Sequence, residues 1–307
     1  MEQIFLKACA KLNLFLDITG KCENGYHLLK SVMQSVDIFD RVSVKKSGEI
    51  SVKCSESALD GENNLAHKAA ALFFGQTGIA GGAEIYIEKR IPMQAGMAGG
   101  SADAAAVLYG LNRLYEAKLS AEELCAMGAR LGADLPFCLC GGTMLCEGIG
   151  ERLSPLPELS DCFFVIVKPE IGMSTAESYR IYDEHEAAGL EHGDFSAMST
   201  ALEAENIQNV GKALYNALEC TVPDSVLKIK SALLKVGAEG ALMTGSGTAV
   251  FGIFDGIESA AKAKAVLSSE YGDIVIARPA KNGVSADESA PVFERLDSLG
   301  IKYECIN

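Results

Sequence analysis

Tryptophan is absent from the sequence, histidine occurs only four times, and no two cysteines have the C-x-x-C spacing. Structural zinc sites take their ligands from closely spaced cysteines and histidines, so this pattern does not indicate a zinc centre. Positive charge is also scarce, because 27 lysines and arginines stand against 41 acidic residues and give a formal net charge of −14. Nucleic acids and anionic membranes attract basic surfaces. The composition argues against both as partners and favours an enzyme with a small-molecule substrate.

Segments that could cross or enter a membrane are missing as well. Uncharged stretches such as residues 135–146 are 12 residues long, short of the roughly 20 that a spanning helix needs. Lys7 and Lys11 interrupt the apolar N-terminal stretch, unlike the core of a signal peptide. The ten cysteines are scattered, and Cys138 and Cys140 occupy alternating positions of an expected strand, which favours core packing over disulfides. We therefore expect a cytoplasmic protein in a reducing compartment.

Strand-like and helix-like patterns interleave without the regular alternation of a Rossmann sheet. Residues 83–89 alternate apolar and polar side chains as a strand does, whereas residues 65–77 are an alanine-rich helix candidate that ends at a glycine. Residues 151–160 contain two prolines and mark the expected boundary. We predict an α+β fold with two domains, residues 1–153 and 154–307. An added helix–strand tail is expected from about residue 280.

An uncharged, glycine-rich loop follows the strand at residues 83–89 and opens a helix. Small residues let several backbone N–H groups approach one anion, and the helix dipole favours negative charge there. The loop has neither the lysine of a Walker motif nor the GxGxxG spacing. It predicts a phosphate site, with a plain helix-capping turn as the alternative. The candidate residues are Gln94, Ala95, Gly96, Met97, Ala98, Gly99, Gly100, Ser101, Ala102, Asp103 and Ala104.

Two charged residues stand alone in apolar sequence. Lys11 lies inside the first strand-like run, and no charge follows Asp134 until residue 147. Burying a charge is costly unless the charge is paired or takes part in chemistry. The two side chains could meet across a cleft, either as a structural salt bridge or as part of a catalytic site.

The loop from Pro92 to Ala105 resembles the ATP-binding motif of the GHMP kinases, a family that includes galactokinase, homoserine kinase and mevalonate kinase. The resemblance implies a two-domain α+β kinase with ATP in the cleft between the domains. It implies that Asp134 accepts the proton of the substrate hydroxyl and that Lys11 holds the hydroxyl in place. It also puts Asn64 and Leu65 on the adenine side. Kinase chemistry requires Mg²⁺. Ser101 is a candidate contact for the metal, and the sequence names no acidic ligand.

Two further strings, at residues 8–16 and 25–27, resemble the family members that phosphorylate a cytidine-diphospho sugar alcohol of the non-mevalonate isoprenoid pathway. The resemblance implies that Tyr26, His27 and Tyr179 surround the cytosine and that Asn13 contacts a hydroxyl or phosphate. Another GHMP kinase, of the homoserine or mevalonate type, is one alternative. A non-catalytic nucleotide-binding module on the same fold is the other, but such a module would not need a lysine and an aspartate at these positions.

Overall fold

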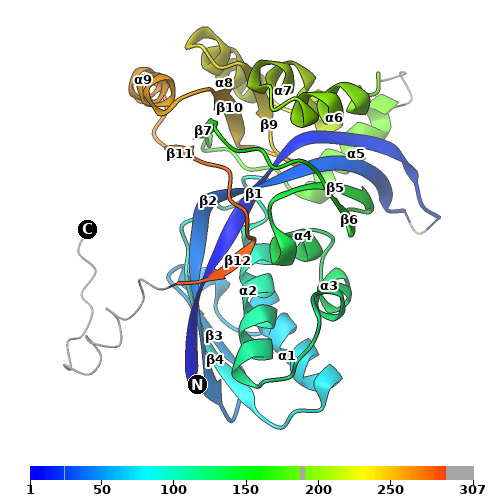
Figure 1. The fold of residues 1–307 in the computed structure, drawn as a ribbon, viewed down its shortest axis with the longest axis vertical. Helices are drawn as coiled ribbons and strands as arrows, with labels where there is room; N and C mark the ends of the chain where they lie inside the picture. The colour runs from blue at the N-terminus through cyan, green and yellow to red at the C-terminus, as the bar shows by residue number, and fades with distance from the viewer. Residues whose placement is uncertain (24, 187–190, 288–307) are drawn as a thin grey trace.

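The computed structural model describes residues 1–23, 25–186 and 191–287. Two lobes lie one above the other along the long axis, and each is built on a β-sheet with helices packed against it (Figure 1). The helix and strand expected in the tail beyond residue 288 lie outside the described residues. Within the described ranges, the helices are too short or too polar to cross a membrane.

The sheet of the lower lobe is built around a long antiparallel hairpin, β1 (Gln3–Lys21) and β2 (His27–Ser47). The order of its main path is β12-β1-β2-β4-β3, and β5, β6 and β8 join it at the sides. Its other strands are β3 (Ser51–Cys54), β4 (Gly82–Glu88), β5 (Thr143–Gly148), β6 (Arg152–Pro155), β8 (Tyr215–Asn216) and β12 (Val284–Ala286). The helices of this lobe are η1 (Ser57–Leu59), α1 (Leu65–Thr77), α2 (Gly99–Leu114), α3 (Ala121–Ala129) and α4 (Leu135–Cys140).

The second sheet is antiparallel throughout, with the order β11-β7-β10-β9. Its strands are β7 (Phe163–Val167), β9 (Gly240–Met243), β10 (Val250–Phe254) and β11 (Ile274–Ala277). The helices of this lobe are α5 (Thr175–Glu186), α6 (Phe195–Glu203), α7 (Ile207–Ala213), η2 (Ala217–Thr221), α8 (Asp224–Lys235) and α9 (Ile257–Leu267). Every residue of β10 is buried, because helices or loops cover both faces of the sheet.

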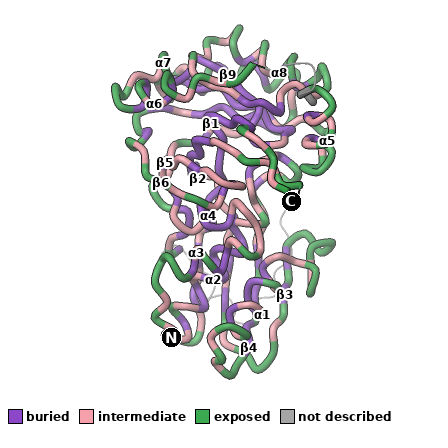
Figure 2. Tube along the Cα trace, turned by 90° about the vertical axis from the view of Figure 1, so that its right-hand side faces the viewer, coloured by how far each residue is buried: buried purple, intermediate pink, exposed green. Residues whose placement is uncertain are grey.

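The long hairpin passes through both hydrophobic cores. Leu6 and Leu12 of β1 belong to a large core that fills the lower lobe and continues under the second sheet, whereas Leu16 and Ile18 belong to a separate core of the upper lobe. Figure 2 shows the buried segments in the interior of both lobes and the exposed segments around the outside. The middle of β1 therefore lies where the lobes meet, and Lys11 is placed there at 4% exposure.

Several boundaries expected from the sequence agree with the structure. Residues 65–77 form α1, and Gly78 ends that helix in the left-handed region at φ 68°. The segment expected to join the domains is shorter than residues 151–160, because β6 pairs with β5 in the first sheet. The chain later returns from the second lobe, and β12 pairs with β1.

The strand expected around Cys138 and Cys140 is wrong, because these residues form helix α4. Asp134 is the N-cap, Pro136 occupies the first turn, and Gly141 ends the helix at φ 74°. Proline is well tolerated in a first helical turn, where its missing N–H would have no helical partner. Cys138 is buried as expected, whereas Cys140 is only partly buried.

Candidate active site

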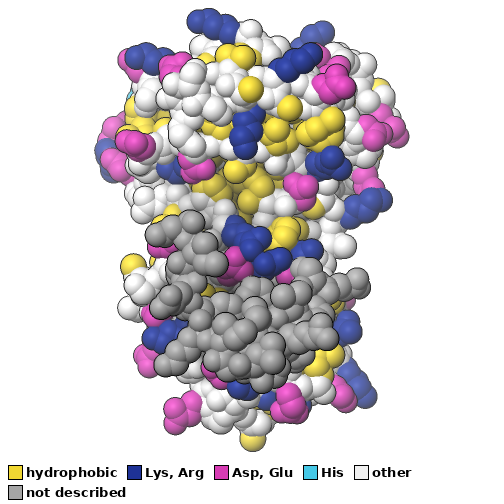
Figure 3. All heavy atoms as spheres, turned by 90° about the vertical axis from the view of Figure 1, so that its left-hand side faces the viewer, with side chains coloured by type: hydrophobic (Ala, Val, Ile, Leu, Met, Phe, Trp, Pro, Cys, Tyr) yellow, Lys and Arg dark blue, Asp and Glu magenta, His cyan; other side chains and the backbone are white. Residues whose placement is uncertain are grey.

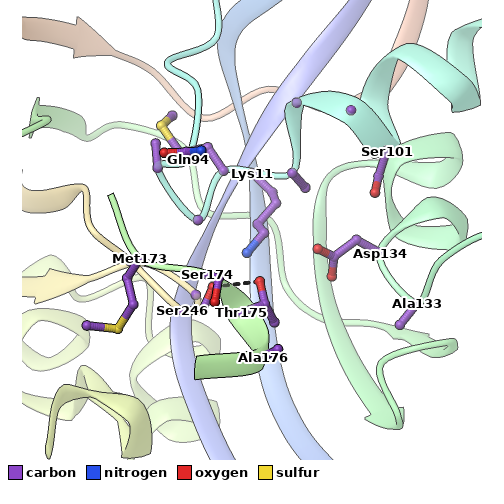
Figure 4. Close-up of a pocket in the computed structure, with 18 of the residues that line it drawn as sticks. Lys11, Gln94, Ser101, Ala133, Asp134, Met173, Ser174, Thr175, Ala176 and Ser246 are labelled. Carbon is purple, nitrogen blue, oxygen red and sulfur yellow. Dashed lines mark hydrogen bonds between the residues drawn. The ribbon is translucent and has the colours of Figure 1, made fainter. Parts of the chain in front are cut away.

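A cavity of about 1410 Å³ lies between the lobes. Its walls come from β1, the glycine-rich loop, the first turn of α2, the start of α4, the start of α5 and residues 245–247 (Figure 4). It is lined by the predicted residues Lys11, Asn13, Tyr26, His27, Asn64, Leu65, Gln94 to Ser101, Asp103, Asp134 and Tyr179. Ala102 and Ala104 do not line it; both are fully buried, because α2 turns these positions toward the core.

Carbonyl groups of the glycine-rich loop are hydrogen-bonded to backbone N–H groups of neighbouring segments. The carbonyls of Ala95 and Met97 accept hydrogen bonds from the backbone N–H groups of Ala249 and Lys11, at 3.3 and 3.2 Å. No hydrogen bond is donated by a backbone N–H between Gly96 and Ser101 to an acceptor within the described residues. A row of N–H donors at the start of a helix is a ready-made anion site.

Alternate residues of the loop adopt left-handed backbone conformations. Gln94, Gly96 and Ala98 have φ angles of 52°, 74° and 59°. Alternation between right-handed and left-handed residues turns successive N–H groups to one side and forms an anion-binding concavity. Such conformations are unfavourable for a side-chain-bearing residue, so the surrounding contacts must hold Gln94 and Ala98 in place.

The backbones of the two lobes pack tightly against each other at two glycines. A Cβ at Gly96 would lie 2.1 Å from the carbonyl oxygen of Thr244, and a Cβ at Gly245 would lie 2.8 Å from the carbonyl oxygen of Gly96. Asn216 holds the loop that follows β9 and contains residues 245–247, because its Nδ2 donates to the carbonyls of Met243 and Gly245 at 2.8 and 2.9 Å. The glycine-rich loop is therefore shaped by the backbone of the other lobe.

Lys11 is oriented by a chain of hydrogen bonds along β1. Its ammonium donates to Asn13 Oδ1, and Asn13 Nδ2 donates to Ser31 Oγ at 2.8 Å. Ser31 donates its own proton to the carbonyl of Phe15 at 2.7 Å, so its Oγ can only accept from Asn13. This order fixes which way the Asn13 amide points and places its oxygen against Lys11.

Asp134 faces Lys11 across the cavity (Figure 4). Its carboxylate makes no hydrogen bond or ion pair with the described residues, although Asp134 is the N-cap of α4. The predicted contact between the two side chains is not formed, because Lys11 donates to Asn13 instead. A carboxylate with open lone pairs opposite an ammonium suits the removal of a proton from a bound hydroxyl.

A second charged cluster, which the sequence did not predict, supports the loop from behind. Lys89, just after β4, donates to the buried carboxylates of Asp40 and Asp103, the latter at 2.6 Å. Asp40 also accepts from the backbone N–H groups of Arg90 and Ile91 at 2.5 and 2.8 Å, where the loop begins. Burial, followed by the charge of Asp40, raises the pKa of Asp103 to about 8. The cluster therefore holds one proton besides those of the ammonium.

At the far end of the cavity His27 is held by its neighbours on α5. Its Nε2 lies 2.6 Å from Asp183 Oδ1, and its ring stacks on Tyr179 with centroids 4.7 Å apart. Asp183 also accepts from Lys21 at 2.6 Å. Burial raises the pKa of Asp183, but the hydrogen bonds from Lys21 and His27 outweigh it and lower the pKa overall. The structure thus places Tyr179 against the imidazole, beside the exposed Tyr26.

Asn64 has a structural task that the sequence did not reveal. Its Oδ1 accepts from the N–H of Ala66 at 2.8 Å and caps α1, while its Nδ2 donates to the carbonyl of Leu59 at 2.8 Å. Only the outer surface of Asn64 and the neighbouring Leu65 remain to contact a ligand in the cavity.

Two family models match the chain: GHMP kinases N terminal domain over residues 64–142, and GHMP kinases C terminal over residues 198–273. The 4-diphosphocytidyl-2-C-methyl-D-erythritol kinase of Clostridium botulinum (strain Eklund 17B / Type B) is 42% identical over 278 residues, covering 89% of this chain and 99% of the relative. The kinase of the same name from Syntrophomonas wolfei is 42% identical over 281 residues, covering 90% and 98%.

Solved structures are also similar. That of a 4-(cytidine 5'-diphospho)-2C-methyl-D-erythritol kinase matches with a TM-score of 0.76 and 31% identity, covering 90% of this chain and 99% of the other. The homoserine kinase from Cytophaga hutchinsonii matches with a TM-score of 0.73 and 18% identity, covering 94% and 98%. At that identity the second likeness is one of fold.

The shared proton at Asp103 predicts a pH dependence of stability. Folding raises the pKa of this carboxyl from 3.8 to about 8, so the folded state binds more protons than the unfolded state between these values. The free energy of unfolding should then fall as pH rises from about 4 to 8. Asp103→Asn keeps the shape of the side chain but cannot ionise. The free energy of unfolding of the variant minus that of the wild type should therefore increase as pH rises. Urea unfolding at pH 6, 7, 8 and 9 measures it. Parallel profiles would contradict the shared proton.

Proposed function

Because the chain belongs to the GHMP kinase family, we propose that it transfers a phosphoryl group from ATP to the 2-hydroxyl of 4-diphosphocytidyl-2-C-methyl-D-erythritol. The reaction is a step of the non-mevalonate route to isoprenoid precursors, and we place it in the cytoplasm. The observation that carries the proposal is one cavity with three parts: an anion-binding loop, Asp134 opposite Lys11, and the His27 cluster at the far end. The homoserine and mevalonate alternatives and the non-catalytic module have no comparable support.

The donor end of the site is the glycine-rich loop. The N–H groups of the loop that have no acceptor among the described residues, together with the N-terminus of α2, would bind the phosphates of ATP, with the base near Asn64 and Leu65.

Mg²⁺ prefers oxygen ligands and usually binds through one or two protein oxygens together with substrate phosphates. The Ser101 hydroxyl lines the cavity and fits this requirement. No group of three or more metal-ligating side chains occurs among the described residues, so the phosphates themselves would supply most ligands. The metal would neutralise charge that develops on the transferred group.

Proton removal is the task that we assign to Asp134. Its open carboxylate would accept the proton of the substrate hydroxyl, while the Lys11 ammonium, held by Asn13, would orient the hydroxyl and stabilise the negative charge on the attacking oxygen. The burial of Lys11 excludes water from this contact and strengthens it.

Recognition of cytosine is the task that we assign to the cluster of Tyr26, His27 and Tyr179. The carboxylate of Asp183 can only accept a hydrogen bond, so its contact with Nε2 favours the His27 tautomer that has its proton on Nε2 and presents Nδ1 as an acceptor. Cytosine offers an exocyclic amino donor where uracil offers a carbonyl acceptor. The tautomer set by Asp183 thus favours cytosine, and Tyr179 keeps the imidazole plane in place.

The direct test is turnover. ATP consumption by the full chain, measured with 4-diphosphocytidyl-2-C-methyl-D-erythritol, homoserine and mevalonate side by side, should show efficient phosphorylation of the first alone. Preference for homoserine or mevalonate would overturn the proposed substrate. Binding of ATP without turnover of any of the three would support the non-catalytic module.

Asp134→Asn should lower kcat by roughly 10²–10⁴ because the amide cannot accept the proton. The KM for ATP should stay close to that of the wild type, since the phosphate loop is untouched. Steady-state kinetics measure both constants, with Asp161→Asn, an exposed carboxylate outside the cavity, as the matched control. A variant with wild-type kcat would show that Asp134 has no catalytic role.

Gly100→Val should abolish ATP binding while the fold is kept. A Cβ at Gly100 meets no protein atom within 4 Å, yet the residue lines the cavity, so the new side chain would occupy the space assigned to phosphate. At Gly99 the Cβ would instead lie 3.3 Å from Lys89 and Ile91, so Gly99→Val disturbs the protein itself. Isothermal titration with ATP and thermal melting separate the effects. Unchanged ATP affinity in a folded Gly100→Val protein would contradict the phosphate assignment.

His27→Ala should weaken binding of the cytidine-diphospho substrate by about 1–3 kcal/mol, the usual cost of losing a base contact, and should leave ATP affinity unchanged. The preference for the cytidine over the uridine substrate should fall as well. Competition assays with the two nucleotides measure it, with His185→Ala on the exposed side of α5 as control. If affinity and base preference both survive, cytosine is bound elsewhere.

A further inference from the structure

Two cysteines meet where helix α3 packs on helix α4. The sulfur atoms of Cys125, on α3, and Cys140, the last residue of α4, are 3.6 Å apart. No other two cysteines are in sulfur contact within residues 1–23, 25–186 and 191–287. Both side chains are partly exposed, whereas the neighbouring Cys138 and Cys146 are buried. Small oxidants can therefore reach this pair.

The two thiols are not equivalent. A hydrogen bond from Cys125 lowers the pKa of Cys140 to about 7, although burial and the charge of Glu122 act in the opposite direction. The same hydrogen bond, together with burial, raises the pKa of Cys125. Cys125 can also donate to the carbonyl of Pro136 at 3.8 Å. The direction of these shifts makes Cys140 the more acidic thiol and Cys125 its hydrogen-bond donor, so we take Cys140 as the nucleophile of the pair.

The cysteine pair is connected to Asp134 through helix α4. Helix α4 has only six residues, and Asp134 is its N-cap while Cys140 is its last residue. The carbonyl of Asp134 accepts the N–H of Cys138 at 2.9 Å, so the residue moves with the helix. A disulfide bond is about 2.05 Å long, so the sulfurs, now 3.6 Å apart, must approach by about 1.5 Å. A displacement of about 1 Å at a reacting group can cost roughly 10² in rate.

We propose that Cys125 and Cys140 form an oxidant-sensitive dithiol, and that its disulfide ties α4 to α3 and slows phosphoryl transfer by displacing Asp134. The second half of this proposal rests on the proposed kinase function and on the role of Asp134 in it; the first half does not.

Hydrogen peroxide is a suitable oxidant. The thiolate of Cys140 attacks one oxygen, the O–O bond breaks, and the departing hydroxide takes up a proton to form water. The product is a sulfenic acid on Cys140. The sulfur of Cys125 then attacks the sulfur of Cys140 and displaces hydroxide, which leaves as water with the proton of Cys125. Two thiols are oxidised by two electrons in total, and one peroxide is reduced to two waters. A dithiol reductant such as dithiothreitol restores the two thiols by thiol–disulfide exchange and is itself oxidised to a disulfide.

Chemical mapping tests the dithiol without reference to activity. The reduced full chain is treated with hydrogen peroxide, and the peptides joined by a disulfide are identified by mass spectrometry. The bond between Cys125 and Cys140 should form first, and it should be absent in Cys125→Ser. It should be retained in Cys22→Ser, which removes a thiol that has no sulfur partner in the part of the chain that the structure describes. Preferential formation of any other bond, or of none, would overturn the proposal.

Alkylation tests the nucleophile. The rate at which iodoacetamide modifies Cys140 should follow an apparent pKa of about 7 in the wild type. Cys125→Ala removes the hydrogen bond, so this apparent pKa should rise and the rate at pH 7 should fall severalfold. An unchanged profile in Cys125→Ala would overturn the role assigned to Cys125.

Kinetics test the link to Asp134. Oxidation of the wild type should lower kcat about tenfold or more, dithiothreitol should restore it, and Cys125→Ser should be insensitive to both treatments. ATP affinity should stay the same throughout. A mapped disulfide with unchanged kcat would overturn the link to Asp134. If the reduced chain did not phosphorylate the substrate at all, the proposed function would fail, while mapping and alkylation would still decide the dithiol.

Discussion

The candidate active site depends on the way strand β1 and the backbone of the second lobe together hold the carbonyl groups of the glycine-rich loop. Ala249 and Lys11 donate to these carbonyls, and Thr244 approaches Gly96 so closely that a methyl group would not fit between them. Because a peptide unit points its N–H and C=O in opposite directions, holding the carbonyls on one side leaves the N–H groups on the other. The proposed anion site therefore requires that both lobes are folded against each other.

Charge is arranged to favour anions locally although the chain carries a net charge of −14. On the face shown in Figure 3, acidic and basic side chains of the described residues are interspersed. Beneath the loop, Lys89 pairs with Asp40 and Asp103, and the raised pKa of Asp103 favours its neutral form below pH 8, which lowers the negative charge next to the proposed phosphate site. Lys11 then supplies positive charge inside the cavity itself. The local field is set by these few buried groups because screening by water is weak there.

Helix α4 connects the candidate active site to the pair of Cys125 and Cys140. At one end Asp134 faces Lys11, and at the other Cys140 touches Cys125. A helix this short has few internal hydrogen bonds, so its position is set by packing against α2 and α3 and by residues such as Gly128, where a Cβ would press on Leu135 at 3.2 Å.

Local properties of the sequence determined much of this protein. The alanine-rich run and its terminal glycine specify α1, because a helix and its cap depend on neighbouring residues alone. The uncharged glycine-rich loop before α2 predicted an anion site, although the contacts that hold this loop come from distant segments. The isolation of Lys11 and Asp134 in apolar sequence marked both as residues of interest.

Tertiary structure decided which distant residues come into contact. Asp183 holds His27 across 156 positions of the chain, and Thr244 accepts from the N–H of Asn13 across 231. Lys11 bonds to Asn13 and not to Asp134, and the short segment that alternates like a strand at Cys138 and Cys140 folds as a helix because its capping residues and its neighbours α2 and α3 favour it. Such contacts depend on how distant segments pack against one another. A local sequence pattern cannot specify them, because it contains no information about which distant residue will lie next to it.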